Sequence, residues 1–147
     1  TIAHGDFRID NMIYGTDSLK PIAVLDWELS TIGHPLSDFA YCAMMYFTPA
    51  NARPSPGLYG LNLKDEGIPS LAEFVAMYAD AAGRTSVDEI NYYMAFSNFR
   101  MAAILQGVYK RSLDGNASSR LAGQMGEFVK TVSKTGLQFT DGTLRVN

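Results

Sequence analysis

Hydrophobic residues follow two different patterns in this 147-residue chain. In residues 1–27, two short apolar runs, 12–14 and 22–25, flank a segment rich in turn-forming residues, Gly15 to Pro21, and this arrangement is typical of a β-hairpin. From residue 35 onwards, apolar residues instead recur at the spacing of an α-helix. The sequence therefore predicts a mainly α fold that begins with a small β-hairpin.

The first two helices are predicted from their start signals. Gly33-His34-Pro35 suits a helix start because proline is favoured at the first helical position, so a helix is expected over 35–47. Ser70-Leu71-Ala72-Glu73 has the capping-box pattern, in which Ser and Glu satisfy each other's backbone N–H, and it predicts a helix from residue 70 to about 82. The intervening residues 48–69 are rich in Pro and Gly, so a long loop is expected there.

Two further helices complete the predicted helical body. Ser86-Val87-Asp88-Glu89 repeats the capping-box pattern and predicts a long helix over 86–113. Apolar residues at helical spacing predict a last helix over 117–135, which is expected to end at Gly136 because glycine favours helix ends. The mostly polar residues 137–147 lack a clear period and are expected to fray.

Composition and charge exclude several classes of protein. The net charge of −3 and the pI of about 5.2 argue against a nucleic-acid-binding protein. No apolar run approaches the ~20 residues that span a bilayer, so a membrane protein is not expected. Cys42 is the only cysteine, which rules out an internal disulfide and favours a cytoplasmic location. The chain begins with Thr1 and not with Met, so we expect it to be a fragment of a longer protein.

Two segments contain the residue types that metal-dependent chemistry uses. His4-Gly5-Asp6-Phe7-Arg8-Ile9-Asp10-Asn11 precedes the hairpin, and Val24-Leu25-Asp26-Trp27-Glu28 ends it. A hairpin centred between residues 18 and 19 would pair Asn11 with Asp26, Tyr14 with Ala23, and Gly15 with Ile22.

The predicted pairing of Asn11 with Asp26 has a chemical consequence. Residues directly opposite each other in an antiparallel ladder point to the same face, with Cβ atoms ~4.5–5.5 Å apart. The Asn11 amide oxygen and the Asp26 carboxylate could then bind one Mg²⁺, which prefers such oxygen ligands at ~2.0–2.1 Å. Asp6 lies on the loop that leads into this site. A carboxylate beside a Mg²⁺ site is what phosphoryl transfer from ATP to a hydroxyl requires.

The combined pattern resembles the aminoglycoside phosphotransferase and choline kinase family, whose members are small-molecule relatives of protein kinases. The segments HGDFRIDN, VLDWE and GHPLSDFAY are most similar to the phosphotransferase domains related to those fused to acyl-CoA dehydrogenases. The resemblance extends through the Pro- and Gly-rich loop and the helical segments, so it covers most of the chain. It implies ATP-dependent phosphorylation of a hydroxyl on a small molecule, with Mg²⁺ and ATP as cofactors.

The resemblance also implies a fold and a domain organisation. The chain would be the mainly helical C-terminal lobe of a protein-kinase-like α+β fold, with the catalytic loop and metal-site hairpin in residues 1–27 and the helical body in residues 33–136. A glycine-rich phosphate loop, a strand lysine and a partnering helix glutamate are not found in the sequence, and these belong to an N-terminal nucleotide lobe. We therefore expect the chain alone to fold but to be inactive, and to self-associate through the bare face that this lobe would cover.

Carried over to matching positions, the resemblance makes Asp6 the catalytic base. It makes Asn11 and Asp26 the metal ligands, which would bind ATP through its Mg²⁺ ion.

Four further residues receive supporting roles from the same resemblance. His4 would brace the catalytic loop, and Asp38 would hold that loop by accepting backbone hydrogen bonds. Arg8 would contact the transferred phosphate, because protein kinases carry a lysine at the matching position. Glu28 would be a further carboxylate at the metal site.

Some of these residues also have a structural interpretation. Asp6 and Asp10 could each be turn residues that cap their own backbone, and for Asp10 this interpretation is preferred. Aromatic and methionine side chains between residues 92 and 101 could line an acyl or aromatic substrate pocket, but at helical spacing a core role is favoured.

Two other functional hypotheses remain open at this stage. One is a non-catalytic binding module derived from a kinase lobe, although such a module would not need to keep Asp6, Asn11 and Asp26 together. The other is a metal-dependent hydrolase that uses His4, His34 and the same two aspartates. The hydrolase requires both histidines near the carboxylates, whereas the position of His34 before Pro35 is explained by the helix start.

Overall fold

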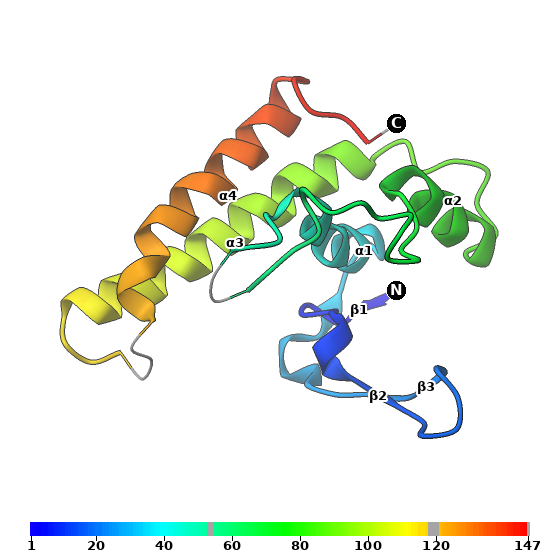
Figure 1. Cartoon of the computed structure of the whole chain (residues 1–147), viewed down its shortest axis with the longest axis horizontal. Helices are drawn as coiled ribbons and strands as arrows, with labels where there is room; N and C mark the ends of the chain where they lie inside the picture. Colours follow the sequence, from blue (N-terminus) through cyan, green and yellow to red (C-terminus); the bar gives the residue numbers. More distant parts are fainter. Residues whose placement is uncertain (53–54, 118–120, 147) are drawn as a thin grey trace.

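The computed structural model describes residues 1–52, 55–117 and 121–146. It consists of a small β-containing head, residues 1–32, and a helical body (Figure 1). The prediction of a mainly α fold with a small β-hairpin is confirmed. None of the helices in these described ranges has the length and apolar character needed to cross a membrane.

Two antiparallel strand pairs form the head. Strand β1 (Ile2–Ala3) pairs with β4 (Thr31–Ile32) and so brings the two ends of the head together. Strand β2 (Met12–Tyr14) pairs with β3 (Pro21–Val24) and forms the predicted hairpin. The short 3-10 helices η1 (Ile9–Asn11) and η2 (Trp27–Leu29) lie at the two ends of this hairpin.

The register of the hairpin differs from the prediction by one residue. Met12 lies opposite Val24, and the Leu25 backbone N–H donates to the Asn11 carbonyl oxygen at 2.8 Å. The expected pairing of Asn11 with Asp26 is therefore wrong. An irregularity between Ile13 and Tyr14 shifts the pairing again, so that Tyr14 lies opposite Pro21 instead of Ala23. A bulge of this kind places two residues of one strand opposite one of the other, which the assumption of a symmetric turn could not anticipate.

The helical body contains the four predicted helices, but the third begins later than predicted and the fourth ends later than predicted. Their bounds are Leu36–Ala43 for α1, Met44–Phe47 for the 3-10 helix η3, Leu71–Ala81 for α2, Ile90–Leu113 for α3, Ala122–Gln124 for the 3-10 helix η4 and Met125–Thr140 for α4. Helices α3 and α4 lie side by side as an antiparallel pair, and α1 crosses beside α3 (Figure 1). Apolar side chains from all three helices form the core, among them Leu36, Phe39, Met94, Leu105, Val132 and Phe139.

Only one of the two predicted capping boxes forms. At α2, Ser70 Oγ accepts from the Glu73 backbone N–H, and Glu73 Oε2 accepts from the Ser70 backbone N–H. At α3, Ser86 Oγ instead donates to Asp88 Oδ2 at 2.9 Å, and the helix begins at Ile90. Val87 is buried in the core, so packing of this side chain positions the segment outside the helix.

The C-terminal prediction is also wrong, because α4 continues through Gly136 to Thr140. Gly136 is buried at the contact with α3, where an added Cβ would lie 3.0 Å from Asn98 Cβ. This glycine therefore allows close helix contact and does not end the helix. Val146 packs in the core and its backbone N–H donates to Asn91 Oδ1 at 2.7 Å, so the described end of the chain is anchored. The predicted start of this helix, 117–121, includes residues 118–120, which lie outside the described ranges.

Candidate active site

The predicted catalytic loop, residues 4–11, is held by the first turn of α1. Asp38 Oδ2 accepts from the His4 backbone N–H at 2.6 Å, and Asp38 Oδ1 accepts from the Gly5 backbone N–H at 2.8 Å. Gly5 has a φ of +86°, and an added Cβ would lie 2.4 Å from the Leu29 carbonyl oxygen. Glycine is required here for both backbone conformation and space.

His4 connects the catalytic loop to the end of the hairpin. The side chain is 2% exposed, and its Nδ1 accepts from the Asp6 backbone N–H at 3.2 Å. Nε2 then carries the ring hydrogen and donates to the Leu25 carbonyl oxygen at 2.7 Å. The ring also contacts Trp27, with centroids 4.7 Å apart. These contacts fix where the backbone of Asp6 lies relative to residues 25–27.

Asn11 and Asp6 are joined directly. Asn11 Nδ2 donates to the Asp6 carbonyl oxygen at 2.9 Å and to Asp6 Oδ2 at 3.0 Å. The other polar atom of the amide, Oδ1, accepts no hydrogen bond from the described residues. The structure thus unites the predicted base with one predicted metal ligand.

Asp26 follows the hairpin in an unusual backbone conformation. Its φ of 69° and ψ of 48° are left-handed, and no other non-glycine residue in the described ranges has a positive φ. Such conformations cost of order 1–3 kcal/mol and concentrate at functional sites. The turn at Asp26 takes the chain out of the β-ladder before Trp27, so the direction of the Asp26 side chain is set by this turn and not by pairing with Asn11.

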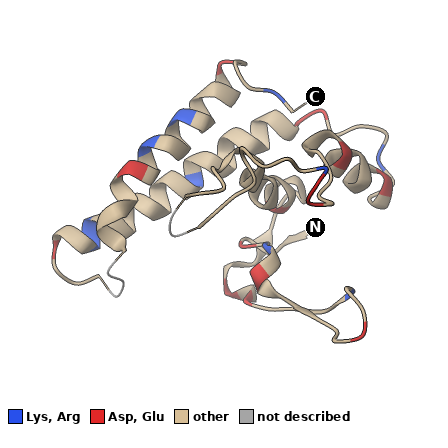
Figure 2. Cartoon of the chain, in the orientation of Figure 1, with Lys and Arg blue, Asp and Glu red and all other residues tan. Residues whose placement is uncertain are grey.

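Glu28 lies close to Asp26. A hydrogen bond with Asp26, followed by the negative charges of Asp26 and Asp6, raises the pKa of the exposed Glu28 carboxyl. A carboxyl whose pKa is raised by neighbouring carboxylates lies in a region of negative potential, which a bound cation would relieve. The head as a whole carries five acidic and two basic residues, whose positions along the backbone are coloured in Figure 2.

Arg8 is paired with Asp10. Arg8 Nε donates to Asp10 Oδ1 at 2.8 Å, and Arg8 Nη2 bonds Asp10 Oδ2. The hydrogen bond and charge of Asp10 raise the pKa of Arg8, and Arg8 in turn lowers the pKa of Asp10. Asp10 was predicted to cap the backbone of its own turn, but in the structure its carboxylate pairs with the Arg8 side chain.

A cavity of about 610 Å³ opens beside the catalytic loop. Asp6, Arg8 and Asp10 line its polar side. Its apolar wall comes from η3, α3 and α4 and includes Met44, Met45, Met101, Ile104, Leu105, Phe128 and Val132. Predominantly apolar walls with a few converging polar groups are typical of small-molecule sites.

Two cavity residues were missed by the sequence reasoning, Tyr41 and Arg100. The Arg100 guanidinium carbon lies 5.3 Å from the centroid of the Tyr41 ring. Tyr41 follows Asp38 by three positions in a predicted helix, which places both on one face, and this spacing could have indicated it. Arg100 is a single charged residue within an apolar segment, and nothing in the neighbouring sequence predicts that it lines the same cavity as Asp6.

The run between residues 92 and 101 divides between several environments. Met94 is fully buried in the core, whereas Met101 lines the cavity. Tyr92 and Phe99 are 67% and 71% exposed, so they belong neither to the core nor to the cavity.

His34 does not join the predicted site. Its ring stacks on Tyr93 with centroids 4.9 Å apart, and its Nε2 lies 3.5 Å from an Arg84 nitrogen. In the described part of the chain, no three His, Cys, Asp or Glu side chains form a ready metal-binding group. The two histidines that a hydrolase site would need are therefore not brought together.

Sequence comparison supplies the family. A model of the phosphotransferase enzyme family matches residues 1–90, which include Asp6, Asn11, Asp26 and Asp38. The chain belongs to this family. The resemblance seen in HGDFRIDN, VLDWE and GHPLSDFAY is confirmed.

Two curated relatives are acyl-CoA dehydrogenase family members. Member 10 of Mus musculus is 45% identical over 139 residues, which make up 95% of this chain and 13% of that protein. Member 11 of Homo sapiens is 43% identical over 144 residues, which make up 97% of this chain and 18% of that protein. The chain thus spans less than a fifth of the length of these relatives.

A solved structure shows the same fold. It is the crystal structure of a protein assigned as an aminoglycoside phosphotransferase from Ralstonia eutropha JMP134, with 39% identity and a TM-score of 0.84. The match covers 97% of this chain and 43% of that chain. The fold of this chain is therefore part of a kinase-like phosphotransferase fold, and the predicted fold class is confirmed.

Proposed function

We propose that this chain carries the base and the Mg·ATP ligands of an ATP-dependent phosphotransferase that acts on a hydroxyl of a small molecule. The observation that carries the proposal is the hydrogen bond from Asn11 to Asp6, at the polar side of a cavity large enough for a small substrate. Glu28 lies close enough to Asp26 and to Asp6 for both carboxylates to raise its pKa. Membership of the phosphotransferase enzyme family supports the same chemistry.

In the proposed reaction, Asp6 orients the acceptor hydroxyl and takes its proton. The hydroxyl oxygen forms a bond to the terminal phosphorus of ATP as the bond from that phosphorus to the bridging oxygen of ADP breaks. Because positioning supplies most of the catalysis in phosphoryl transfer, the fixed backbone of Asp6 matters as much as its carboxylate.

The donor set fits Mg²⁺. Asn11 offers an amide oxygen, and Asp26 and Glu28 offer carboxylates, which are the oxygen ligands that Mg²⁺ prefers. The raised pKa of Glu28 reflects uncompensated negative charge at this place. Mg²⁺ held there would neutralise phosphate charge during transfer.

Arg8 is proposed to contact the transferred phosphate. The Arg8 side chain is 43% exposed even while it is paired with Asp10, and both residues line the cavity. Asp10 therefore limits the directions in which Arg8 can point.

The cavity also bears on the acceptor. Its largely apolar wall favours an acceptor with an apolar body. Arg100 adds a positive charge near Tyr41, and Asp10 is already neutralised by Arg8, so the cavity does not suit a polycation such as an aminoglycoside.

The nucleotide lobe is proposed to come from another part of a longer protein. The relatives and the solved structure extend well beyond the matched segment. We propose that this chain alone does not transfer phosphate, because it lacks the phosphate-cradling loop and its lysine. The cytoplasm, which supplies ATP, is the proposed location.

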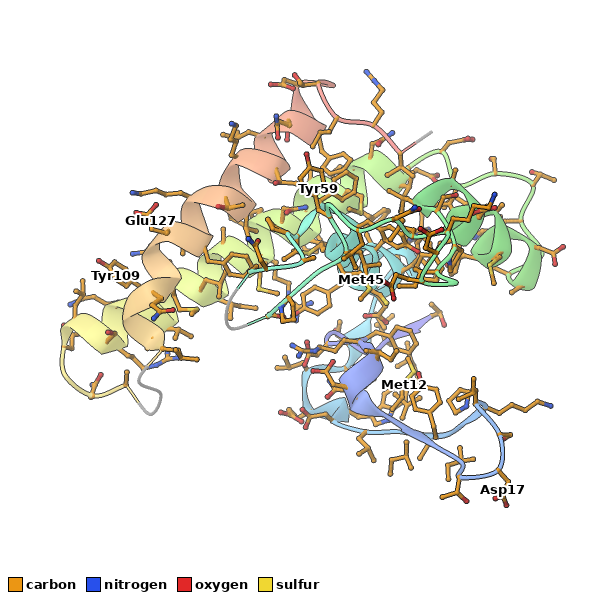
Figure 3. The ribbon with its side chains drawn as sticks, in the orientation of Figure 1. Met12, Asp17, Met45, Tyr59, Tyr109 and Glu127 are labelled. Carbon is orange, nitrogen blue, oxygen red and sulfur yellow. The ribbon has the colours of Figure 1, made fainter. Side chains whose placement is uncertain are left out.

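The test uses Asp6→Ala in the full-length protein. We expect phosphoryl transfer to fall by at least a hundredfold, within the range for loss of a general base, with ATP affinity by calorimetry within about threefold of the parent. Asp17→Ala, at the hairpin tip and away from the helical body (Figure 3), is the matched control and should retain the parent rate. Transfer by Asp6→Ala within a few-fold of the parent rate would overturn the assignment and favour a non-catalytic binding module.

A further inference from the structure

Helix α1 reaches the catalytic loop at two points. Asp38, in its first turn, accepts the backbone N–H groups of His4 and Gly5. Tyr41 lies three residues further on, which places it on the same face of the helix. Tyr41 lines the cavity together with Asp6, and only 9% of the residue is exposed. One short helix therefore contacts both the backbone of the loop and the surroundings of its carboxylate.

The Tyr41 side chain lies near the Asp6 carboxylate, and both residues line the same cavity. Burial, followed by the negative charge of Asp6, raises the pKa of Tyr41 to about 12. The phenol consequently stays protonated at neutral pH and has a hydrogen to donate. A tyrosine that only filled space in the core would not need its hydroxyl at this position.

The ring of Tyr41 is itself held in place. Arg100, from α3, lies over it at 5.3 Å from the ring centroid, a distance at which a cation is attracted to an aromatic face. The backbone of Tyr41 is fixed in the middle of α1, whose neighbouring residues Ala40 and Ala43 are fully buried. The ring therefore has little freedom to move away from the cavity that it lines with Asp6.

We propose that Tyr41 is a positioning residue for the catalytic base. Asn11 Nδ2 donates to Asp6 Oδ2, and in this proposal the Tyr41 hydroxyl is a second donor, from α1, so that the carboxylate is held from two different elements. Asp6 is then fixed with lone-pair capacity left for the hydroxyl of the acceptor. This inference rests on the proposed function, because it assumes that Asp6 is the base.

The experiment compares Tyr41→Phe with Tyr46→Phe in the full-length protein. Both substitutions remove one hydroxyl and keep the ring. The Tyr46 hydroxyl donates to the Pro69 carbonyl oxygen at 2.9 Å, and Tyr46 does not line the cavity described above, so Tyr46→Phe is the matched control. For each variant, kcat, the KM for ATP, and the free energy of unfolding in urea are measured beside the parent and Asp6→Asn.

We expect Tyr41→Phe to lower kcat about tenfold, which is the size of effect that loss of one hydrogen bond to a charged group produces. The KM for ATP should stay within about twofold, because the nucleotide does not contact Tyr41 in this proposal. Tyr46→Phe should change kcat by less than twofold. A loss of stability common to both variants, without the difference in kcat, would show that the Tyr41 hydroxyl has only a structural role.

The failure of this inference can be distinguished from the failure of the proposed function. If Asp6→Asn loses activity while Tyr41→Phe keeps the parent kcat, the positioning role is wrong and the base assignment stands. If Asp6→Asn keeps the parent kcat, Asp6 is not the base, and both proposals are wrong.

Discussion

Asn11 donates its side-chain amide to Asp6 twice, to the carbonyl oxygen at 2.9 Å and to carboxylate Oδ2 at 3.0 Å. The two residues are five positions apart, on either side of Arg8 and Asp10, whose side chains pair with each other. A change at Asn11 will therefore affect both the cation that its oxygen is proposed to bind and the orientation of the proposed base.

The first prediction concerns the metal ligands. We expect Asn11→Ala and Asp26→Ala each to raise the Mg²⁺ concentration needed for half-maximal activity by at least tenfold, with Asp26→Ala the more damaging because it removes a full negative charge. Residues that bind one ion act as a unit, so the double variant should lose less than the sum of the two free-energy effects. The measurement is a Mg²⁺ titration of activity for all three variants. Strictly additive losses would mean that the two side chains do not share an ion.

The second prediction concerns the anchor of the catalytic loop. Asp38→Ala leaves the backbone N–H groups of His4 and Gly5 without their charged acceptor. We expect a loss of about 3 kcal/mol in the free energy of unfolding, together with reduced activity, because hydrogen bonds to charged groups contribute ~1.5–3 kcal/mol each. Urea denaturation measures the first effect. Glu66→Ala, on an exposed part of the long loop, is the control and should change stability by less than about 0.5 kcal/mol. Equal stability of the two variants would contradict the anchoring role.

The third prediction is a pH dependence. Arg8 lowers the pKa of Asp10, so the pair contributes stability above the unfolded carboxyl pKa of about 3.9, and this stability is lost as the pH falls through the lower folded pKa. The two side chains are 43% and 57% exposed, and such pairs contribute at most about 1 kcal/mol. Asp10→Asn should therefore destabilise the protein slightly at pH 7, and this effect should decrease as the pH falls below the unfolded carboxyl pKa.

Urea denaturation of the parent and of Asp10→Asn at several pH values checks this sign. The difference at pH 7 should also shrink in about 1 M salt, which screens exposed charges. A difference in stability that grows as the pH falls would show that Asp10 acts through some other contact.

The fourth prediction compares two helical glycines. At Gly136, an added Cβ would lie 3.0 Å from Asn98 Cβ, whereas at Gly107 the nearest atom would be the mobile end of Arg111 at 3.9 Å. Gly107→Ala should stabilise the protein by up to about 1 kcal/mol through helix propensity. Gly136→Ala gains the same propensity but forces α3 and α4 apart, so a net loss of about 1–2 kcal/mol is expected. Thermal unfolding of both variants decides between these outcomes, and a Gly136→Ala variant as stable as Gly107→Ala would contradict the close contact.

Features encoded by neighbouring residues could be predicted from the sequence. The capping box at Ser70 forms because its two partners are three residues apart and close on each other within one turn. The hairpin forms because a turn-rich segment separates two apolar runs. The HGDFRIDN, VLDWE and GHPLSDFAY segments indicated the family because their polar residues stand at fixed spacing in the chain.

Features that depend on distant residues could not be predicted in this way. The hairpin register depends on a local irregularity, and one residue of slip moves Asn11 from Asp26 to Leu25. From the local sequence, Gly136 predicts the end of a helix. In the structure it lies inside α4, where the lack of a side chain allows close contact with Asn98 of α3.

The surroundings of Asp6 depend on both kinds of information. Asp6 and Asn11 are close in the chain, and the sequence placed Asp6 on the loop that leads to Asn11, although it paired Asn11 with Asp26 and did not predict the hydrogen bonds between Asn11 and Asp6. Tyr41 and Arg100 reach the same place from α1 and α3, and they do so only after the core has packed these helices together. Hydrogen-bonding groups close in sequence can meet through local geometry alone, whereas groups far apart meet only where burial of apolar surface sets the positions of whole helices.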